Sequence, residues 1–345
     1  MKKIFLIGLT AAAMMASCSN DETVEMAQQK AISFSNAFVN NGTRSIVDPS
    51  FTTTSLNDFA VYGFTQNGQI FDGVKVSKGG AASTGWSYDN VQYWVPGNTY
   101  TFGAIAPHSV AGNVSNVTLP TGATKVEMEV AFTNKDADQV DLLHAAPTQI
   151  TGVTASYTNP VGMTFNHQLS KVKFSFENAV GVGYNVKVSN VKITDAYKEG
   201  TLTVAATKNT WGGQTDKTLE LNFGNVVADG ATADEAAVIA NAATLESYNE
   251  KLMIPMGSSA IYTVTFTAEL YKGDVLLGTY NHRVEIKNVE FKLGYCYDFK
   301  ASLTHKNITA EDELNPIEFN VTKVEDWNKA DVDKDLNVPT TQSGI

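Results

Sequence analysis

A thiol lies at the end of a short apolar run near the start of the chain. Lys2 and Lys3 precede this run, which extends from residue 4 to residue 15, and small residues separate it from Cys18. A positive start, an apolar stretch too short to span a bilayer and a small-residue end are typical of a secretory signal. A cysteine directly after such a stretch is a candidate for lipid attachment. We therefore interpret residues 1–17 as a signal peptide.

The residues around this thiol resemble a bacterial lipobox, with Met15 where leucine is usual. The resemblance implies that Cys18 is acylated and becomes the first residue of a lipoprotein. The alternative is an ordinary signal peptide that contains a cysteine. The tract 19–22 resembles the acidic signal that sends Bacteroidetes lipoproteins to the outer cell surface. We predict a tether over 18–30, a location on the outer membrane surface, and contact with the membrane only through the lipid.

The other reactive residues form no recognisable catalytic or metal-binding pattern. The five histidines are scattered, and zinc-protease, nucleophile-elbow and phosphate-loop motifs are absent from the sequence. Residues 331–337 alternate acidic side chains like the first half of a calcium loop. Leu336 and Gln342 replace the glycine and glutamate that such a loop requires. We predict a solvated tail there, no metal site, no cofactor, and a function other than catalysis.

Charge and cysteine usage narrow the classes of partner. The net charge of −11 over 345 residues argues against nucleic acids and anionic membranes as partners. If Cys18 carries lipid, the second cysteine, Cys296, lacks a disulfide partner, and we predict a small buried hydrophobe. His167 alternates with Phe165 and Leu169, which predicts a buried histidine with a satisfied hydrogen bond rather than a metal ligand.

From about residue 31 the sequence alternates apolar and polar residues in short runs separated by turn residues, which predicts strands. The expected strands are 32–38, 58–64, 100–106, 125–132, 171–176, 186–194, 201–205, 263–271, 283–291 and 317–327. Turns are expected at Asn67-Gly68, Asp72-Gly73, Pro96-Gly97 and 272–274. The Ala-rich stretch 233–249 fits either a short helix or an ordered loop. This pattern predicts an all-β protein of antiparallel sandwiches, with one domain over 31–160 and a second over 161–345.

Several blocks of the chain resemble one family, the fimbrillins, which are type V pilus subunits and related lipoproteins of Bacteroides and Porphyromonas. The blocks are 30–34, 41–45, 86–88, 92–94, 100–107, 141–145, 165–172, 252–255 and 317–327. The resemblance runs from the signal to Trp327. It implies two tandem transthyretin-like β-sandwich domains. It also implies partners that are other pilus subunits, joined by strand addition, and an arginine-specific maturation protease.

In that family a protease removes an N-terminal strand, and a strand from another subunit fills the groove left behind. The corresponding strand here is 31–40, and the expected cleavage lies between Arg44 and Ser45. Arg283, the only other arginine, lies in a predicted strand. The donor candidates are 317–327 and the tail to residue 345. Because the end of that tail is polar, a stalk, an anchor and a tip subunit all remain open, and the sequence names no surface ligand.

A different class of function is also consistent with the sequence. Five aromatic residues could form a sugar-stacking platform of a glycan-binding lipoprotein or monomeric adhesin: Trp86, Tyr88, Tyr93, Trp94 and Tyr100. Aromatic residues at such spacing more often fill the core of a sandwich. We therefore predict that they are core residues.

Overall fold

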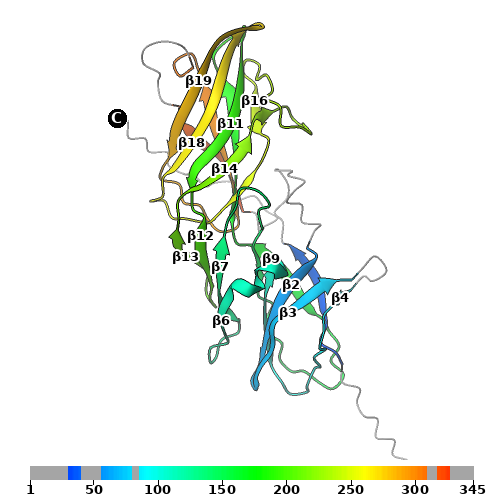
Figure 1. Ribbon diagram of the computed structural model, residues 1–345. Coiled ribbons are helices and arrows are strands. Elements are labelled where there is room, and N and C mark those ends of the chain that lie inside the picture. Colours follow the sequence, from blue (N-terminus) through cyan, green and yellow to red (C-terminus); the bar gives the residue numbers. More distant parts are fainter. Residues whose placement is uncertain (1–29, 40–55, 80–84, 309–316, 327–345) are drawn as a thin grey trace, which may run out of the picture.

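The computed structural model describes residues 30–39, 56–79, 85–308 and 317–326. These residues form strands β1 to β21, arranged in four sheets, and one short 3-10 helix, η3 (His108–Asn113). Within these ranges no helix has the length and hydropathy needed to cross a membrane. The predicted all-β sandwich class is confirmed. Figure 1 shows an elongated molecule with its earlier strands at the lower end and its later strands at the upper end.

A seven-stranded sheet in the order β1-β9-β8-β5-β2-β3-β4 forms the lower part of the molecule. Its strands are β1 (Phe34–Val39), β2 (Asp58–Thr65), β3 (Gly68–Lys78), β4 (Trp86–Ser87), β5 (Tyr100–Ala106), β8 (Leu143–Ala145) and β9 (Val161–His167). The sheet curls, so that its two end strands approach each other. Because β5 is buried along its whole length, both faces of this sheet carry a hydrophobic core.

The alternation along β2 divides its side chains between these two cores. Phe59 and Val61 belong to one apolar cluster, whereas Ala60 and Tyr62 belong to the other. The first cluster also contains Ile32 and is termed the plug core below. Successive side chains of a strand point to opposite faces, so one strand can supply both cores.

The second core is covered by a four-stranded sheet in the order β13-β12-β7-β6. Its strands are β6 (Val114–Thr118), β7 (Glu127–Thr133), β12 (Glu199–Val204) and β13 (Thr210–Thr215). The sequence analysis places a domain boundary at residue 160, but strands from both sides of this residue share the lower sheets. Strand β9 completes the seven-stranded sheet, and the β12–β13 hairpin reaches back to pair with β7. Both segments bury their apolar residues against the earlier part of the chain.

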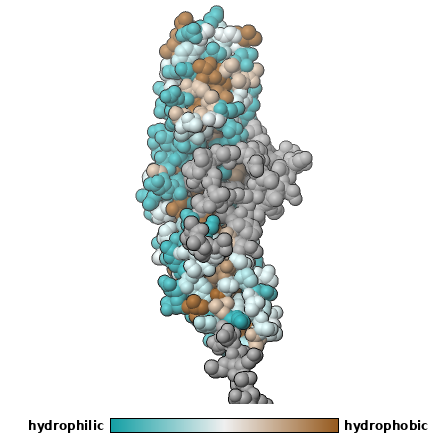
Figure 2. Space-filling view, turned by 90° about the vertical axis from the view of Figure 1, so that its right-hand side faces the viewer, coloured by the Kyte–Doolittle hydropathy of each residue, from teal (hydrophilic) through white to brown (hydrophobic). Residues whose placement is uncertain are grey.

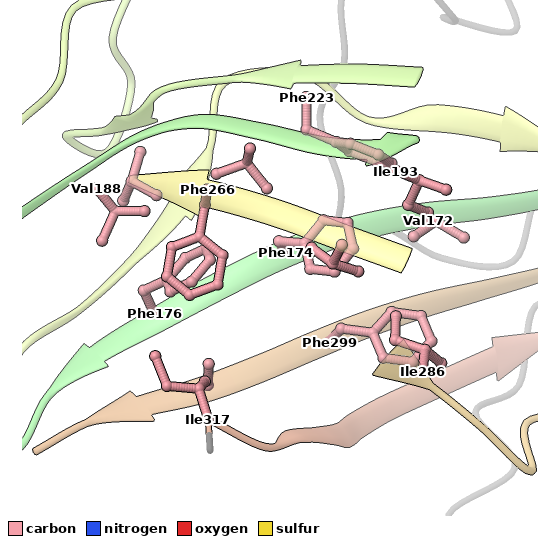
Figure 3. Close-up of a cluster of buried hydrophobic side chains, with 14 of the residues drawn as sticks. Val172, Phe174, Phe176, Val188, Ile193, Phe223, Phe266, Ile286, Phe299 and Ile317 are labelled. Carbon is pink, nitrogen blue, oxygen red and sulfur yellow. The ribbon is translucent and has the colours of Figure 1, made fainter. Parts of the chain in front are cut away.

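Two further sheets form the upper sandwich. One has the order β15-β16-β10-β20-β21, with β17 also paired to β10, and the other has the order β14-β11-β18-β19. The strands are β10 (Ser170–Asn178), β11 (Tyr184–Ala196), β14 (Leu219–Gly224), β15 (Val226–Val227), β16 (Thr244–Ser247), β17 (Lys251–Met253), β18 (Tyr262–Lys272), β19 (Val275–Ile286), β20 (Tyr295–Leu303) and β21 (Phe319–Asp326). Their inner faces meet in a core rich in phenylalanine, part of which Figure 3 shows.

Polar contacts tie the two sandwiches together at their junction. The side-chain amide of Asn134 donates to the backbone oxygen of Leu252 at 2.8 Å, and Lys251 lies 3.0 Å from Asp136. Lys171 and Glu250 form a buried ion pair at 3.1 Å. Burial opposes a charge on Lys171, but its attractions to Glu250, Cys296 and Asp141 together outweigh burial and raise the pKa of this lysine. The first two contacts join the two sandwiches, whereas the ion pair lies within the upper one, between β10 and the residue before β17.

One detail differs from the sequence-based expectation, and a second resolves an alternative that the sequence left open. Asp72-Gly73 is not a turn but lies inside β3, where an extra residue opposite β2 makes a β-bulge and Gly73 has a φ of 63°. A positive φ suits both a turn and a bulge, so the local residues cannot tell them apart. The stretch 233–249 is an ordered loop that ends in β16, which decides between the two alternatives.

Candidate assembly site

Strand β1 and the residues before it fill a slot at the edge of the lower sandwich. β1 pairs with a single neighbouring strand, β9, in parallel. Just before β1, the backbone N–H of Ile32 donates to Gln92 at 2.8 Å, and the N–H of Trp94 donates to Lys30 at 2.9 Å. The backbone of this segment is therefore held on one side by residues 92–94 and on the other by β9. We call residues 30–39 the plug.

The plug inserts two large apolar side chains into the plug core. Ile32 is 1% exposed and Phe34 is 4% exposed. The Phe34 ring makes edge-on or tilted contacts at 5.5–6.1 Å with four aromatic rings: Phe59, Phe71, Tyr88 and Phe102. Aromatic pairs in such arrangements stabilise a core beyond the area that they bury. Loss of the plug would leave these rings facing an empty slot.

One polar group also recognises the plug. The hydroxyl of Tyr88 donates to the backbone oxygen of Ile32 at 2.7 Å and accepts a bond from the N–H of Gln92 at 3.2 Å. Burial raises the pKa of Tyr88, so its hydroxyl stays protonated and able to donate. Because this bond goes to a backbone oxygen, any strand in the same position can accept it.

The last described strand, β21, resembles the plug in how it is held. It lies at the edge of its sheet and pairs with β20 alone. Ile317, just before it, is 4% exposed, and the Phe319 ring packs on Phe174 and Phe176 at 5.1 and 5.7 Å. Figure 3 shows Ile317 in the cluster that contains Phe176. Both edge segments therefore anchor an Ile-x-Phe pair, at 32–34 and at 317–319.

The predicted modification and cleavage residues, Cys18, Arg44 and Ser45, lie outside the described residues, as does the acidic tract 331–337. Arg283 lies within β19, paired opposite Thr265, as the sequence pattern predicts. Cys296 is 6% exposed and belongs to the second core, so the prediction of a buried small residue is confirmed. No group of three histidine, cysteine or acidic side chains is arranged to bind a metal in the part of the chain that the structure describes.

His167 is buried, and its Nδ1 lies 2.8 Å from a carboxylate oxygen of Asp141, which confirms the predicted satisfied histidine. A second histidine, His144, was not singled out by the sequence. Its Nδ1 accepts a bond of 3.2 Å from the side-chain amide of Asn209. Burial, helped by Lys125, lowers the pKa of His144 to about 4. This side chain is therefore neutral at pH 7.

This buried histidine predicts a loss of stability in mild acid. Its folded pKa lies below its unfolded value of about 6.5, so the unfolded chain binds a proton first and stability falls as the pH drops from about 6.5 to about 4. At about 1.4 kcal/mol per pH unit, the loss amounts to about 3 kcal/mol. Urea unfolding at several pH values should show this slope, and it should be shallower in His144→Gln but unchanged in His305→Gln. An equal slope in all three proteins would contradict the assignment.

The aromatic residues do not form an open platform. Trp94 and Tyr100 are 2% and 1% exposed, and Trp86 and Tyr88 pack against the plug core. Only Tyr93 of the five is exposed. The prediction that these residues serve the core is therefore confirmed for the other four. The five aromatic residues therefore do not provide the flat exposed surface that a sugar-stacking site requires.

The fold and the slot define a protein of two joined β-sandwiches whose first strand closes an edge. The sequence matches the fimbrillin-like family over residues 43–327, so the chain belongs to that family. No curated protein matches the chain.

Solved structures of two proteins from Bacteroides species are similar to this chain. A fimbrial protein from Bacteroides vulgatus is 15% identical, with a TM-score of 0.57 over 86% of this chain and 99% of its own. A protein from Bacteroides uniformis, assigned provisionally to cell adhesion, is 18% identical, with a TM-score of 0.48 over 88% and 99%. The shared fold rests on the first of these.

Sequence reasoning found the plug but not the residues that receive it. Phe59 and Phe102 lie in strands that the alternation predicts, whereas Phe71 lies in β3, which was not predicted. Alternation also does not say which strands share a face. The Ile-x-Phe pair that occurs in both edge segments is the signal in the sequence that links the plug to β21.

Proposed function

We propose that this chain is a surface-anchored subunit of a type V pilus that assembles by donor-strand exchange after proteolysis, and that it supports adhesion. The observation that carries the proposal is the plug: an edge segment that buries Ile32 and Phe34 and is held between β9 and residues 92–94. An exposed sheet edge is a template for a strand from another chain. A segment that can be removed from such an edge converts a closed subunit into one that accepts a strand.

Cleavage after Arg44 provides the trigger in this proposal. It separates the plug and everything before it from the rest of the chain. Burying side chains such as Ile32 and Phe34 is worth roughly 1.5–3 kcal/mol each. An incoming strand gains this free energy, less the entropy of ordering its own residues. The partners are other copies of this chain or related subunits, and an arginine-specific protease.

Digestion of the folded protein with an arginine-specific protease is expected to give a new N-terminus at Ser45, followed by oligomers. Arg283 should resist, since it lies in a strand paired with β18. N-terminal sequencing identifies the cut, and light scattering follows the mass. An Arg44→Ala protein should stay monomeric under the same conditions. A clean cut that leaves a stable monomer would instead favour the monomeric adhesin.

Strand β21 is the donor that the geometry favours. Ile317 and Phe319 have the same spacing and chain direction as Ile32 and Phe34, and Val321 continues the same face. A β21 strand in the slot can place its two large side chains where those of the plug were. The backbone oxygen of Ile317 would then accept the bond from Tyr88. Replacement by an equivalent strand keeps the slot filled and links two subunits.

The anchor of the uncut chain is the lipid on Cys18 in this proposal. Replacing Cys18 with alanine should abolish incorporation of a palmitate analogue and release the uncut protein from the membrane fraction. The Ser17→Ala protein, which keeps the thiol and a small residue before it, should label normally. If the Cys18→Ala protein is still labelled and still retained in the membrane fraction, the lipoprotein assignment is contradicted.

A further inference from the structure

Exposed large apolar side chains gather at the two ends of the described structure. Four lie at the upper end: Val182 (90% exposed), Val275 (64%), Leu276 (48%) and Leu277 (49%). Three lie in one short segment of the lower sandwich: Val91 (45%), Tyr93 (46%) and Val95 (44%). We call the first group the distal patch and the second the proximal patch. Exposed apolar groups in such clusters mark interaction surfaces more often than single ones do.

The distal patch is built by the turn of the β18–β19 hairpin and the turn before β11. Lys272 pairs with both Val275 and Tyr184, and the N–H of Gly273 donates to Gly183 at 3.4 Å. Val182 therefore lies beside the run 275–277. Figure 2 shows hydrophobic residues exposed at this upper end. Three consecutive exposed apolar residues at a hairpin tip contribute little to the fold, which points to a partner.

The proximal patch borders the slot that holds the plug. Ala31 and Tyr93 form an antiparallel bridge, and Trp94 of the same segment is buried in the plug core. Val91, Tyr93 and Val95 alternate with these inward residues and face solvent. The side chain of Gln66 donates to Asn98 and accepts a bond from the backbone N–H of Thr99, and these bonds tie the end of this segment to the β2–β3 turn. That turn lies at the lower end of the molecule in Figure 1.

The residues that follow β20 lie next to the distal patch, and β21 begins beside the end of β20, because Phe319 pairs with Ala301. β20 ends at Leu303, and the ring of His305 lies 4.7 Å from the ring of Tyr184. The Nζ of Lys272, the last residue of β18, lies 5.8 Å from that same tyrosine ring. A β21 strand that detaches from its own sheet therefore departs from the distal end. If it enters the slot of another copy in the direction of the plug, it enters beside the proximal patch.

We propose that the distal patch of one copy packs on the proximal patch of the next copy when its β21 strand fills the slot. This inference rests on the proposed function and adds the surface on which the two subunits meet. A contact between different surfaces of identical subunits does not give a two-fold dimer, and it builds an open filament when successive rotations do not close into a ring. Seven side chains bury less than the roughly 1,200 Å² of a stable interface, so the contact forms only when the strand tethers the two copies.

The test compares the growth of filaments from cleaved proteins. A chain with both Leu276→Ser and Leu277→Ser should elongate at least tenfold more slowly than the unchanged protein after cleavage at Arg44. The matched control carries Val238→Ser and Ile261→Ser, which are exposed apolar residues away from both patches. It should elongate like the unchanged protein. Equal loss in the control, or normal growth of the Leu276/Leu277 variant, overturns the inference.

Cross-linking provides a second measurement that does not depend on growth rates. Two chains, one with Tyr93→Cys and one with Leu276→Cys, are cleaved, mixed and oxidised, with Cys18 removed by the cleavage itself. A disulfide between the two chains is expected after cleavage and not before it. Filaments that grow without this disulfide overturn the patch contact and leave the proposed function standing. If the unchanged cleaved protein forms no filaments at all, both proposals fall.

Discussion

A synthetic peptide that spans residues 315–327 is expected to bind the protein after cleavage at Arg44 and not before it. In the uncut protein, the plug occupies the slot, and Phe34 contacts four aromatic rings there. After the cut, the plug is held only by noncovalent contacts, and a strand with Ile317 and Phe319 at the same spacing can displace it. Fluorescence anisotropy of a labelled peptide on dilute cleaved protein measures this binding.

Variants of the peptide separate insertion from nonspecific adhesion. Replacing Ile317 and Phe319 with serine removes roughly 1.5–3 kcal/mol of burial at each position, so the Kd should rise at least about 100-fold. Replacing Glu318 and Asn320 with serine should leave the Kd nearly unchanged, because both are exposed on the opposite face of the segment. Equal binding of all three peptides, or binding to the uncut protein, would rule out the slot as the receptor.

A residue of the slot that receives the peptide can also be substituted, independently of the peptide. Tyr88→Phe removes the hydroxyl that bonds the backbone oxygen of the strand in the slot but keeps the aromatic ring. A hydrogen bond of this kind contributes about 0.5–1.5 kcal/mol. The variant should bind the peptide only a few-fold to about tenfold more weakly. A smaller rise in Kd for Tyr88→Phe than for the peptide without Ile317 and Phe319 would show that apolar burial contributes more to the affinity than this hydrogen bond.

Local periodicity predicted ten of the 21 described strands, β19 only at its C-terminal end, but not the way in which the sheets are joined. The strand 100–106 was predicted with the bounds that the structure has, since its Tyr100-to-Ala106 run is flanked by a Pro-Gly turn and a proline. The pairing of β7 with β12 joins segments about 70 residues apart. No local pattern encodes such a partner, because any strand with one apolar face fits any similar sheet edge.

In the candidate site, too, local sequence predicts a strand but not the contacts that strand makes with residues far away in the sequence. Alternation was enough to predict a strand over 32–38, and the resemblance to the fimbrillins implied that this strand fills a groove. Neither was enough to find the contact of Phe34 with Phe71, which depends on the curl of the seven-stranded sheet. The polar junction was missed for a related reason. Lys171 and Glu250 are ordinary surface residue types, and only the packing of β10 against the end of the other sandwich makes them buried.

Replacing Phe34 with alanine is expected to lower the unfolding free energy of the uncut protein by about 3–5 kcal/mol, the range for removing a buried phenylalanine ring. Urea unfolding followed by tryptophan fluorescence measures the change, because Trp86 and Trp94 both contact the plug core. Ser35→Ala, a half-buried position on the same strand, should change the stability by less than about 0.5 kcal/mol. An unchanged stability for Phe34→Ala would contradict the buried position of the ring.

The same substitution should have the opposite effect on assembly. In the cut protein the plug must leave before a donor strand enters, and Phe34 is the side chain with the most ring contacts in it. If the plug loses its contacts in the transition state for release, about 3–5 kcal/mol corresponds to a release rate roughly 150- to 5,000-fold higher. The Phe34→Ala protein should therefore be less stable before cleavage but should start to polymerise sooner after it. Slower polymerisation of this variant would show that the first strand supports the fold without controlling access to the slot.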